Sequence, residues 1–327
     1  MDGQAMLGGV RIRWLGALWA ALLWLLVPGA SVAAPQRAVA VLYDDSGSMS
    51  KPSTRWIAAN LSLQVLSALL AEGDELHVAT MAVPPAVTTV VVPGGLDGWL
   101  ARVQAEPSPG KGTPYGGVGA LLQALQASAA AEKWLVVLTD GAFDDYSSAL
   151  AQQQIEQIVK PLGIRPMFLL LESDKVYDAQ RQWQQQAGAA VISIDRARAL
   201  PQRMEEVAAL LTGRDSAGLQ LRRQGDELVV SSRFPLRNLV VLVQGEQGLA
   251  ITGAQAGSRA MQVRAHALKP VQGHADFPAG GLVAHLGLAG AIDQGDEVAR
   301  IRFNRPLGAA QVKVLADVAA RMDVTVV

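Results

Sequence analysis

Short, wholly apolar runs alternate with segments of helical periodicity from residue 38 to residue 211, and this alternation restricts the possible folds most. The runs at 38–43 (AVAVLY) and 134–138 (WLVVL) predict strands that are buried on both faces. Further strands are predicted at 75–81, 87–92, 167–171 and 190–194, and helices at 53–70, 96–105, 116–130, 146–159, 177–186 and 200–211. Alternating strands and helices predict a doubly wound, mostly parallel α/β sheet, with one hairpin around Pro84 and Pro85.

The pattern changes after Gly213, where helical periodicity becomes weak and short strands follow one another between glycine-rich or polar turns. These strands are predicted at 219–222, 227–231, 239–244, 261–265, 282–288, 297–303 and 312–316. Their number and spacing favour a small all-β domain, an antiparallel sandwich of the immunoglobulin-like kind. We therefore expect an α/β domain at 35–213 and an all-β domain at 214–327, with a protease-sensitive link at 212–218.

The first 34 residues have the layout of a secretory signal peptide. Arg11 and Arg13 precede an apolar run at 14–27, and small residues follow up to Ala33 and Ala34. The alternative is a retained anchor, but the run has 14 residues and a spanning helix needs about 20. We expect cleavage near Ala33, export to a bacterial periplasm or exterior, and no membrane span in the mature protein.

Composition excludes several classes of function. The chain has no cysteine, so disulfides, thiolate metal sites and cysteine nucleophiles are ruled out. The formal net charge is -1, without a long run of one sign. A nucleic-acid-binding protein usually carries a basic patch, so nucleic acid is not an expected partner.

Oxygen-bearing side chains follow two of the predicted strands and occupy one loop between them. Asp44, Ser46 and Ser48 come directly after the strand at 38–43, and Asp140 comes directly after the strand at 134–138. Thr113 lies in a glycine- and proline-rich loop before a predicted helix. In open α/β sheets the ligand lies beyond the carboxyl ends of the strands. Hydroxyls and carboxylates without histidine or cysteine suit Mg²⁺, Mn²⁺ or Ca²⁺.

These three segments resemble the metal-ion-dependent adhesion site of von Willebrand factor type A domains. Asp44-x-Ser46-x-Ser48 matches the first motif, Thr113 in Gly-Thr-Pro the loop threonine, and Asp140 in Thr-Asp-Gly the second aspartate. The resemblance covers residues 37–213. It implies that the three hydroxyls contact a metal ion, while the two aspartates act through water and by hydrogen-bonding the hydroxyls. It also implies an open metal position that accepts a carboxylate from a partner protein.

Two functions remain open on this evidence. One is a metal-dependent protein-binding module, and the other is a scaffold or accessory factor of an envelope assembly or secretion machine, with a structural metal. We do not expect an enzyme. Asp74 and His77 have the Asp-x-x-His spacing of one class of serine hydrolase, but His77 falls in a predicted strand, so it is not expected to act as a catalytic base. Asp45 is predicted to be solvated. Asp144 and Asp145 are predicted to cap the next helix, with a further cation site as the alternative.

Overall fold

The computed structural model describes residues 37–50, 53–92, 94, 111–173, 175–195, 199–212, 218–244, 247–268 and 280–318. The predicted signal peptide, the predicted helix at 96–105 and residues 213–217 of the predicted protease-sensitive link lie outside these ranges. Residues Pro35–Val327 pack as one unit. Among the described helices, none is long and apolar enough to cross a membrane.

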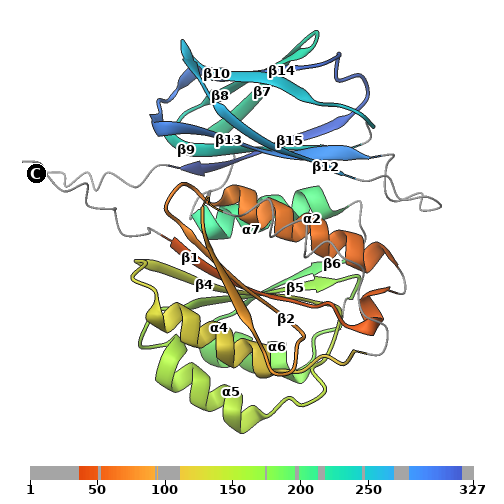
Figure 1. The fold of residues 1–327 in the computed structure, drawn as a ribbon, viewed down its shortest axis with the longest axis vertical. Coiled ribbons are helices and arrows are strands. Elements are labelled where there is room, and N and C mark those ends of the chain that lie inside the picture. Colours follow the sequence, from red (N-terminus) through yellow and green to blue (C-terminus); the bar gives the residue numbers. More distant parts are fainter. Residues whose placement is uncertain are drawn as a thin grey trace, which may run out of the picture. The chain divides into compact units, whose positions relative to one another are not determined.

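Six strands form the first sheet in the order β3-β2-β1-β4-β5-β6 (Figure 1). Their bounds are β1 Arg37–Tyr43, β2 Glu75–Thr80, β3 Val87–Val91, β4 Glu132–Thr139, β5 Arg165–Leu171 and β6 Ala190–Ile194. All neighbours are parallel except β2 and β3, which form the predicted antiparallel hairpin. The doubly wound, mostly parallel sheet is thereby confirmed. Its strand order reverses between β1 and β4, which is where such sheets bind ligands.

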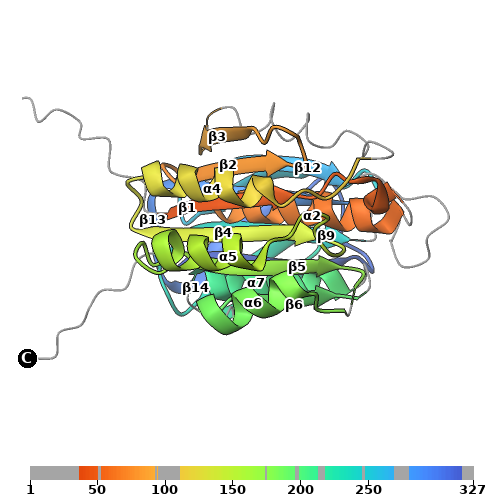
Figure 2. The same ribbon diagram turned by 90° about the horizontal axis from the view of Figure 1, so that it is seen from below.

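Helices cover both faces of this sheet (Figures 1 and 2). One face carries α4 Gly116–Ala127, α5 Ser148–Gln154 and α6 Asp178–Ala187, and the other carries α2 Ser53–Leu69 and α7 Leu200–Thr212. The predicted helix at 116–130 ends earlier because Ser128 adopts an extended conformation. The predicted helix at 146–159 begins at Ser148 and finishes as a π-helix, η2 Ile155–Val159.

The remainder of the described chain forms two antiparallel sheets, which confirms the all-β prediction. The five-stranded sheet has the order β11-β10-β14-β8-β7, and the four-stranded sheet has the order β12-β13-β9-β15. The strands are β7 Leu219–Gln224, β8 Glu227–Ser232, β9 Leu236–Gln244, β10 Ile251–Ala256, β11 Arg259–Ala260, β12 Gln262–Leu268, β13 Gly281–Ile292, β14 Gly295–Phe303 and β15 Gln311–Val318. The sequence did not predict β10 or β11, because Gly253 and the polar residues around it weaken the strand pattern of β10.

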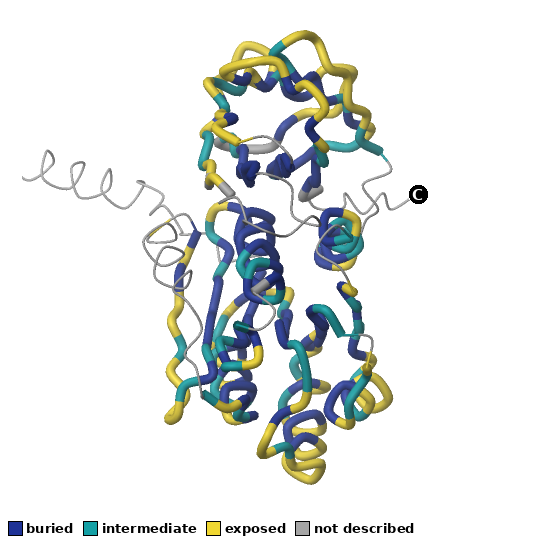
Figure 3. The backbone as a smooth tube through the Cα atoms, turned by 90° about the vertical axis from the view of Figure 1, so that its right-hand side faces the viewer, coloured by how far each residue is buried: buried dark blue, intermediate teal, exposed yellow. Residues whose placement is uncertain are grey.

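In the four-stranded sheet, β9 and the first half of β13 are almost entirely buried, whereas the described side chains of the edge strand β12 are exposed or half-buried; buried backbone is dark blue in Figure 3. On β9, Val241 and Val243 point into the core between the two antiparallel sheets. Val240 and Leu242 alternate with them and join the core of α2 and α7. Consecutive residues of a strand point to opposite faces, so an unbroken apolar run fits a strand with a core on each side.

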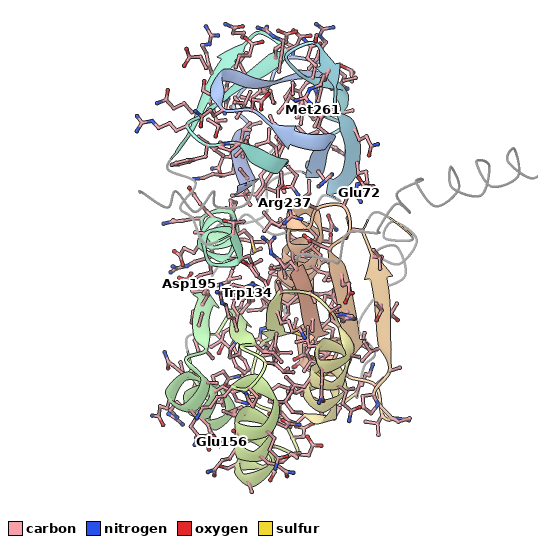
Figure 4. All side chains as sticks on the ribbon, turned by 90° about the vertical axis from the view of Figure 1, so that its left-hand side faces the viewer. Glu72, Trp134, Glu156, Asp195, Arg237 and Met261 are labelled. Carbon is pink, nitrogen blue, oxygen red and sulfur yellow. The ribbon has the colours of Figure 1, made fainter. Side chains whose placement is uncertain are left out.

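Polar contacts accompany this shared core. Arg237, labelled in Figure 4, donates from Nη2 to Oδ1 of the fully buried Asp74 at 3.0 Å. Asp74 also accepts from the backbone N–H groups of Arg37 and Ala71. The side-chain amide of Asn238 donates to the carbonyl of Leu69 at 3.2 Å. The end of α2 and the start of β9 are therefore joined by hydrogen bonds as well as by apolar contact.

Candidate metal centre

Asp44 lies at the reversal of strand order, directly after β1. Its N–H donates to the carbonyl of Leu138 on β4 at 3.0 Å. The side chain is fully buried, and its two oxygens accept separate hydrogen bonds. Oδ1 accepts from the Ser46 N–H at 2.9 Å, and Oδ2 accepts from the Thr139 hydroxyl at 2.8 Å. These bonds fix the carboxylate against the turn that follows β1.

The electrostatic surroundings of Asp44 raise its pKa above the ordinary value. Burial is the largest cause, because it removes water from the charged form. Hydrogen bonds from Ser46 and Thr139 act in the opposite direction, while the negative charge of Asp140 raises the pKa further. A cation at this edge of the sheet would favour the ionised form of Asp44.

Ser46, Ser48 and Asp140 form a continuous chain of side-chain oxygens. The hydroxyls of Ser46 and Ser48 are 3.0 Å apart, on either side of Gly47. The Ser48 hydroxyl donates to Oδ1 of Asp140 at 3.1 Å. The turn leads into a short 3-10 helix, η1 Gly47–Ser50, from which the Ser48 hydroxyl reaches the end of β4. The two segments predicted to meet at this edge do so.

The Thr113 segment is tied to this turn through its own backbone and a neighbouring ion pair. The carbonyl of Lys111 accepts from the Gly47 N–H at 3.0 Å. The Lys111 ammonium contacts Oδ2 of Asp45 at 2.6 Å, and Oδ1 of Asp45 accepts from the Met81 N–H. Asp45 is thus not the solvated surface residue that the sequence suggested, because it links the loop, the turn after β1 and the end of β2.

Asp144 and Asp145 hold the Thr113 loop, and the prediction that they cap the next helix is wrong. Oδ2 of Asp144 accepts from the Thr113 N–H at 2.7 Å, and the Asp144 N–H donates to the Thr113 carbonyl at 3.0 Å. Oδ1 of Asp145 accepts from the Tyr115 N–H at 2.6 Å. The residue that caps α5 is Ser147. Hydrogen bonds therefore join the loop around Thr113 to the loop around Asp144, although the two are distant in sequence.

Close packing beside this contact requires glycine. A Cβ atom added to Gly112 would lie 2.5 Å from Oδ2 of Asp144. The next turn is anchored by Tyr115, whose buried hydroxyl accepts from the Trp183 indole N–H at 3.1 Å and donates to Gln154. The Thr113 backbone is consequently held from both sides, and the residue is 8% exposed.

The donor set has the chemistry of a site for a hard divalent cation. Magnesium bonds of 2.0–2.1 Å at right angles place neighbouring oxygens about 3 Å apart, whereas calcium bonds place them at about 3.3–3.7 Å. The Ser46 and Ser48 hydroxyls are hydrogen-bonded to each other at 3.0 Å and lie close enough to share one ion. Among the described residues no group of three or more His, Cys, Asp or Glu could hold a metal ion. An ion at this edge would therefore draw on the serine hydroxyls as well as on the two aspartates.

Arg55 is a further residue of this edge that the sequence pattern did not indicate. It lies in the first turn of α2, and its Nη1 is 2.6 Å from Oδ2 of Asp140. Nothing in the spacing of residues 46–55 shows that this side chain turns back toward the end of β4. His77, by contrast, is the strand residue that the sequence predicted: it lies on β2 and contacts Thr89 and Glu75. Trp56 and Trp134 are both buried, as core residues are; Figure 4 labels Trp134.

Comparisons with known proteins give structural likeness only. No protein-family model matches the chain. No curated protein matches it either. Among solved structures, a von Willebrand factor type A protein from Catenulispora acidiphila shares 16% identity over 88% of this chain and 67% of its own, with a TM-score of 0.44.

Two further structures show similar values. Proximal thread matrix protein 1 from the mussel byssus, with a zinc-occupied MIDAS motif, shares 16% identity over 54% of this chain and 48% of its own, at a TM-score of 0.41. The pilus adhesin SpaC from Lactobacillus rhamnosus GG shares 13% identity over 83% of this chain and 39% of its own, also with a TM-score of 0.41. The chain thus spans less than half the length of these two proteins. At such identities and TM-scores the likeness carries no information on function.

Proposed function

We propose that the protein is an exported, metal-dependent protein-binding module and not an enzyme. A divalent cation, Mg²⁺ or Mn²⁺ before Ca²⁺, would be held by Asp44, Ser46, Ser48, Thr113 and Asp140. The observation that carries the proposal is the chain of side-chain oxygens from Ser46 through Ser48 to Asp140, beside the buried Asp44, at the reversal of strand order.

Each residue has a separate task in this proposal. Ser46, Ser48 and Thr113 present neutral oxygens, while Asp44 and Asp140 orient the turn and the hydroxyls through hydrogen bonds. An ion held mainly by neutral ligands keeps much of its positive charge, so it supplies an electrophilic position for a carboxylate of the partner. Magnesium retains water readily, and one water can be exchanged for that carboxylate.

The metal proposal is tested by isothermal calorimetry with Mg²⁺. Asp140→Ala should reduce the affinity for Mg²⁺ by about 10–100-fold, as for other losses of groups that orient metal ligands. Glu156→Ala is the matched control, because Glu156 (labelled in Figure 4) is an exposed carboxylate on η2 that pairs with Lys160 four residues later. An affinity for Mg²⁺ that is the same in all three proteins would contradict the site.

The partner proposal is tested by pull-down from an extract of exported proteins, with Mg²⁺ and with chelator. A binding module loses its partner in chelator and in the Asp140→Ala variant. Retention of one partner under all conditions would instead support the scaffold, in which a metal ion has only a structural role.

Export is tested separately by intact-mass measurement of the protein recovered outside the cytoplasm. We expect a mature N-terminus near Ala34. A mass that still includes residues 1–33, recovered with membranes, would favour the retained anchor.

A further inference from the structure

The positively charged guanidinium of Arg55 lies beside a carboxylate of the proposed metal site. One oxygen of Asp140 accepts from the Ser48 hydroxyl, and the other is 2.6 Å from the Arg55 guanidinium. Asp140 is 7% exposed and Arg55 25% exposed, so the pair is partly shielded from water. Charges in such surroundings interact more strongly than at an open surface.

A second carboxylate lies on the far side of the same guanidinium. Oε2 of Glu172, at the end of β5, is 4.0 Å from Nε of Arg55. Glu172 has a φ of 50°, and it is the only described non-glycine residue with a positive φ. Its N–H donates to the carbonyl of Ile194 at 2.7 Å, which holds this backbone against β6. Non-glycine residues kept in this left-handed region are uncommon and cluster at functional sites.

The arrangement does more than position Asp140. Asp140 follows β4 directly, and its backbone is set by the sheet, while the Ser48 hydroxyl already orients its carboxylate. Arg55 is thus not required to define where Asp140 lies. What Arg55 adds is charge: it makes the electrostatic potential at the Ser46–Ser48–Asp140 oxygens less negative. Glu172 has the opposite effect from a greater distance.

We propose that Arg55 is a specificity-determining residue of the metal site, which weakens the binding of a divalent cation alone and strengthens the binding of a carboxylate to the metal-loaded site. The inference rests on the proposed function. A positive charge repels the metal ion and attracts the partner's anion, so the two effects have opposite signs. Metal ion and carboxylate then raise each other's affinity by the same factor, as linkage requires.

Calorimetric Mg²⁺ titrations of the wild type, Arg55→Gln and Arg55→Lys test this, each with and without sodium acetate at constant ionic strength. Arg55→Gln should bind Mg²⁺ alone at least about tenfold more tightly, because one unit charge near a divalent ion has this effect even in a water-like dielectric. Arg55→Lys keeps the charge and should stay close to wild type. Acetate should tighten Mg²⁺ binding more in the wild type than in Arg55→Gln.

Glu172→Gln provides a test that does not depend on the folding of the Arg55 variants. It removes a negative charge outside the proposed ligand set, so Mg²⁺ should bind more weakly, by about threefold at its greater distance. Unchanged or weaker Mg²⁺ binding in a folded Arg55→Gln variant, or unchanged binding in Glu172→Gln, would overturn the inference but leave the proposed function intact. Absence of Mg²⁺ binding in every protein would overturn both. Binding in Arg55→Gln but not in the wild type would support the inference.

Discussion

Asp144 shows how a residue that is not a proposed ligand can control the candidate site. Its carboxylate accepts from the Thr113 N–H, and its own N–H donates to the Thr113 carbonyl. The loop is therefore fixed on both sides of Thr113. The residue contributes position, and a hydroxyl displaced by a fraction of an ångström is a poorer ligand for an ion with strict geometry.

We therefore predict that Asp144→Ala lowers the affinity for Mg²⁺ by about 10–100-fold, although Asp144 is no ligand. The Thr113 N–H would lose its partner, and the loop would sample other positions. Asp178→Ala is the control, because Asp178 is an exposed carboxylate that pairs with Arg181 three residues further along α6. Calorimetry on both variants decides, and equal affinities would contradict the role of Asp144.

His285 gives the β sandwich a sensitivity to acid. It lies on β13, it is buried, and Nη2 of Arg264 donates to its Nδ1 at 3.1 Å. Burial and the positive charge of Arg264 lower the pKa of His285 to about 3. The unfolded chain binds this proton near pH 6.5, the folded chain only near pH 3. Stability from this group is complete above pH 6.5 and is lost as the pH falls toward 3.

We predict that the free energy of unfolding falls by up to about 1.4 kcal/mol per pH unit between pH 6.5 and 3 because of this residue. His285→Gln does not titrate, so its unfolding free energy should depend less on pH in that window. Urea unfolding at several pH values measures both slopes, and parallel slopes for the two proteins would disprove the assignment.

Residues of the candidate site differ in how far sequence could predict them. Asp44 and Asp140 could be named because each follows a buried strand directly, and the sheet brings those strand ends together. Arg55 and Asp144 could not, because their roles depend on side-chain directions across loops. A pattern of residue types along the chain carries no information on those directions.

At the scale of elements, α4 packs directly against β1. A Cβ atom added to Gly117 would be 2.6 Å from Cδ1 of Leu42, and so the helix can approach the strand only because this residue lacks a side chain. A Cβ atom added to Gly116, one position earlier, would be 3.9 Å from its nearest neighbour, Cγ of Pro85. The two glycines therefore form a matched pair.

We predict that Gly117→Ala lowers the free energy of unfolding by about 1–3 kcal/mol through overpacking. Gly116→Ala should be neutral or should stabilise the protein by up to about 1 kcal/mol, since alanine is the better helix residue. Urea unfolding of the two variants tests this, and equal effects would show that the close approach is not maintained in solution.

The bounds of the strands in the six-stranded sheet were predicted to within two residues, and those of α2, α6 and α7 to within one. β6 Ala190–Ile194 matches its predicted bounds, because the mainly apolar run ends at the charged residue Asp195. The change to a π-helix at Ile155 was not predicted, since α- and π-helices need the same residue types there and only packing distinguishes them.

At the scale of the whole molecule, the α/β part and the β sandwich share a core. Val240, Leu242, Val283 and Leu315 of the four-stranded sheet belong to the same cluster of buried residues as α2 and α7. We propose that 35–213 and 214–327 are two domains whose stabilities are coupled through this cluster. Each would expose apolar surface if the other were removed.

We predict that Leu242→Ala lowers the free energy of unfolding by about 2–5 kcal/mol and that both parts still unfold together. Leu221→Ala is the control, because Leu221 is 40% exposed on the outer strand β7. Circular dichroism reports the helices of the α/β part, and limited proteolysis with mass spectrometry reports the sandwich. Loss of only the sandwich in Leu242→Ala would show that the α/β part is independent.

The surroundings of α2 limit how this helix can move. Residues 61–69 are buried on every side, between the six-stranded sheet and the four-stranded sheet, whereas Arg55, Ile57 and Asn60 near its beginning are only partly buried. A helix enclosed in this way cannot shift along its axis without disrupting its packing against both sheets. A shift of Arg55 on ligand binding would therefore require the first two turns of α2 to bend, while residues 61–69 stay in place.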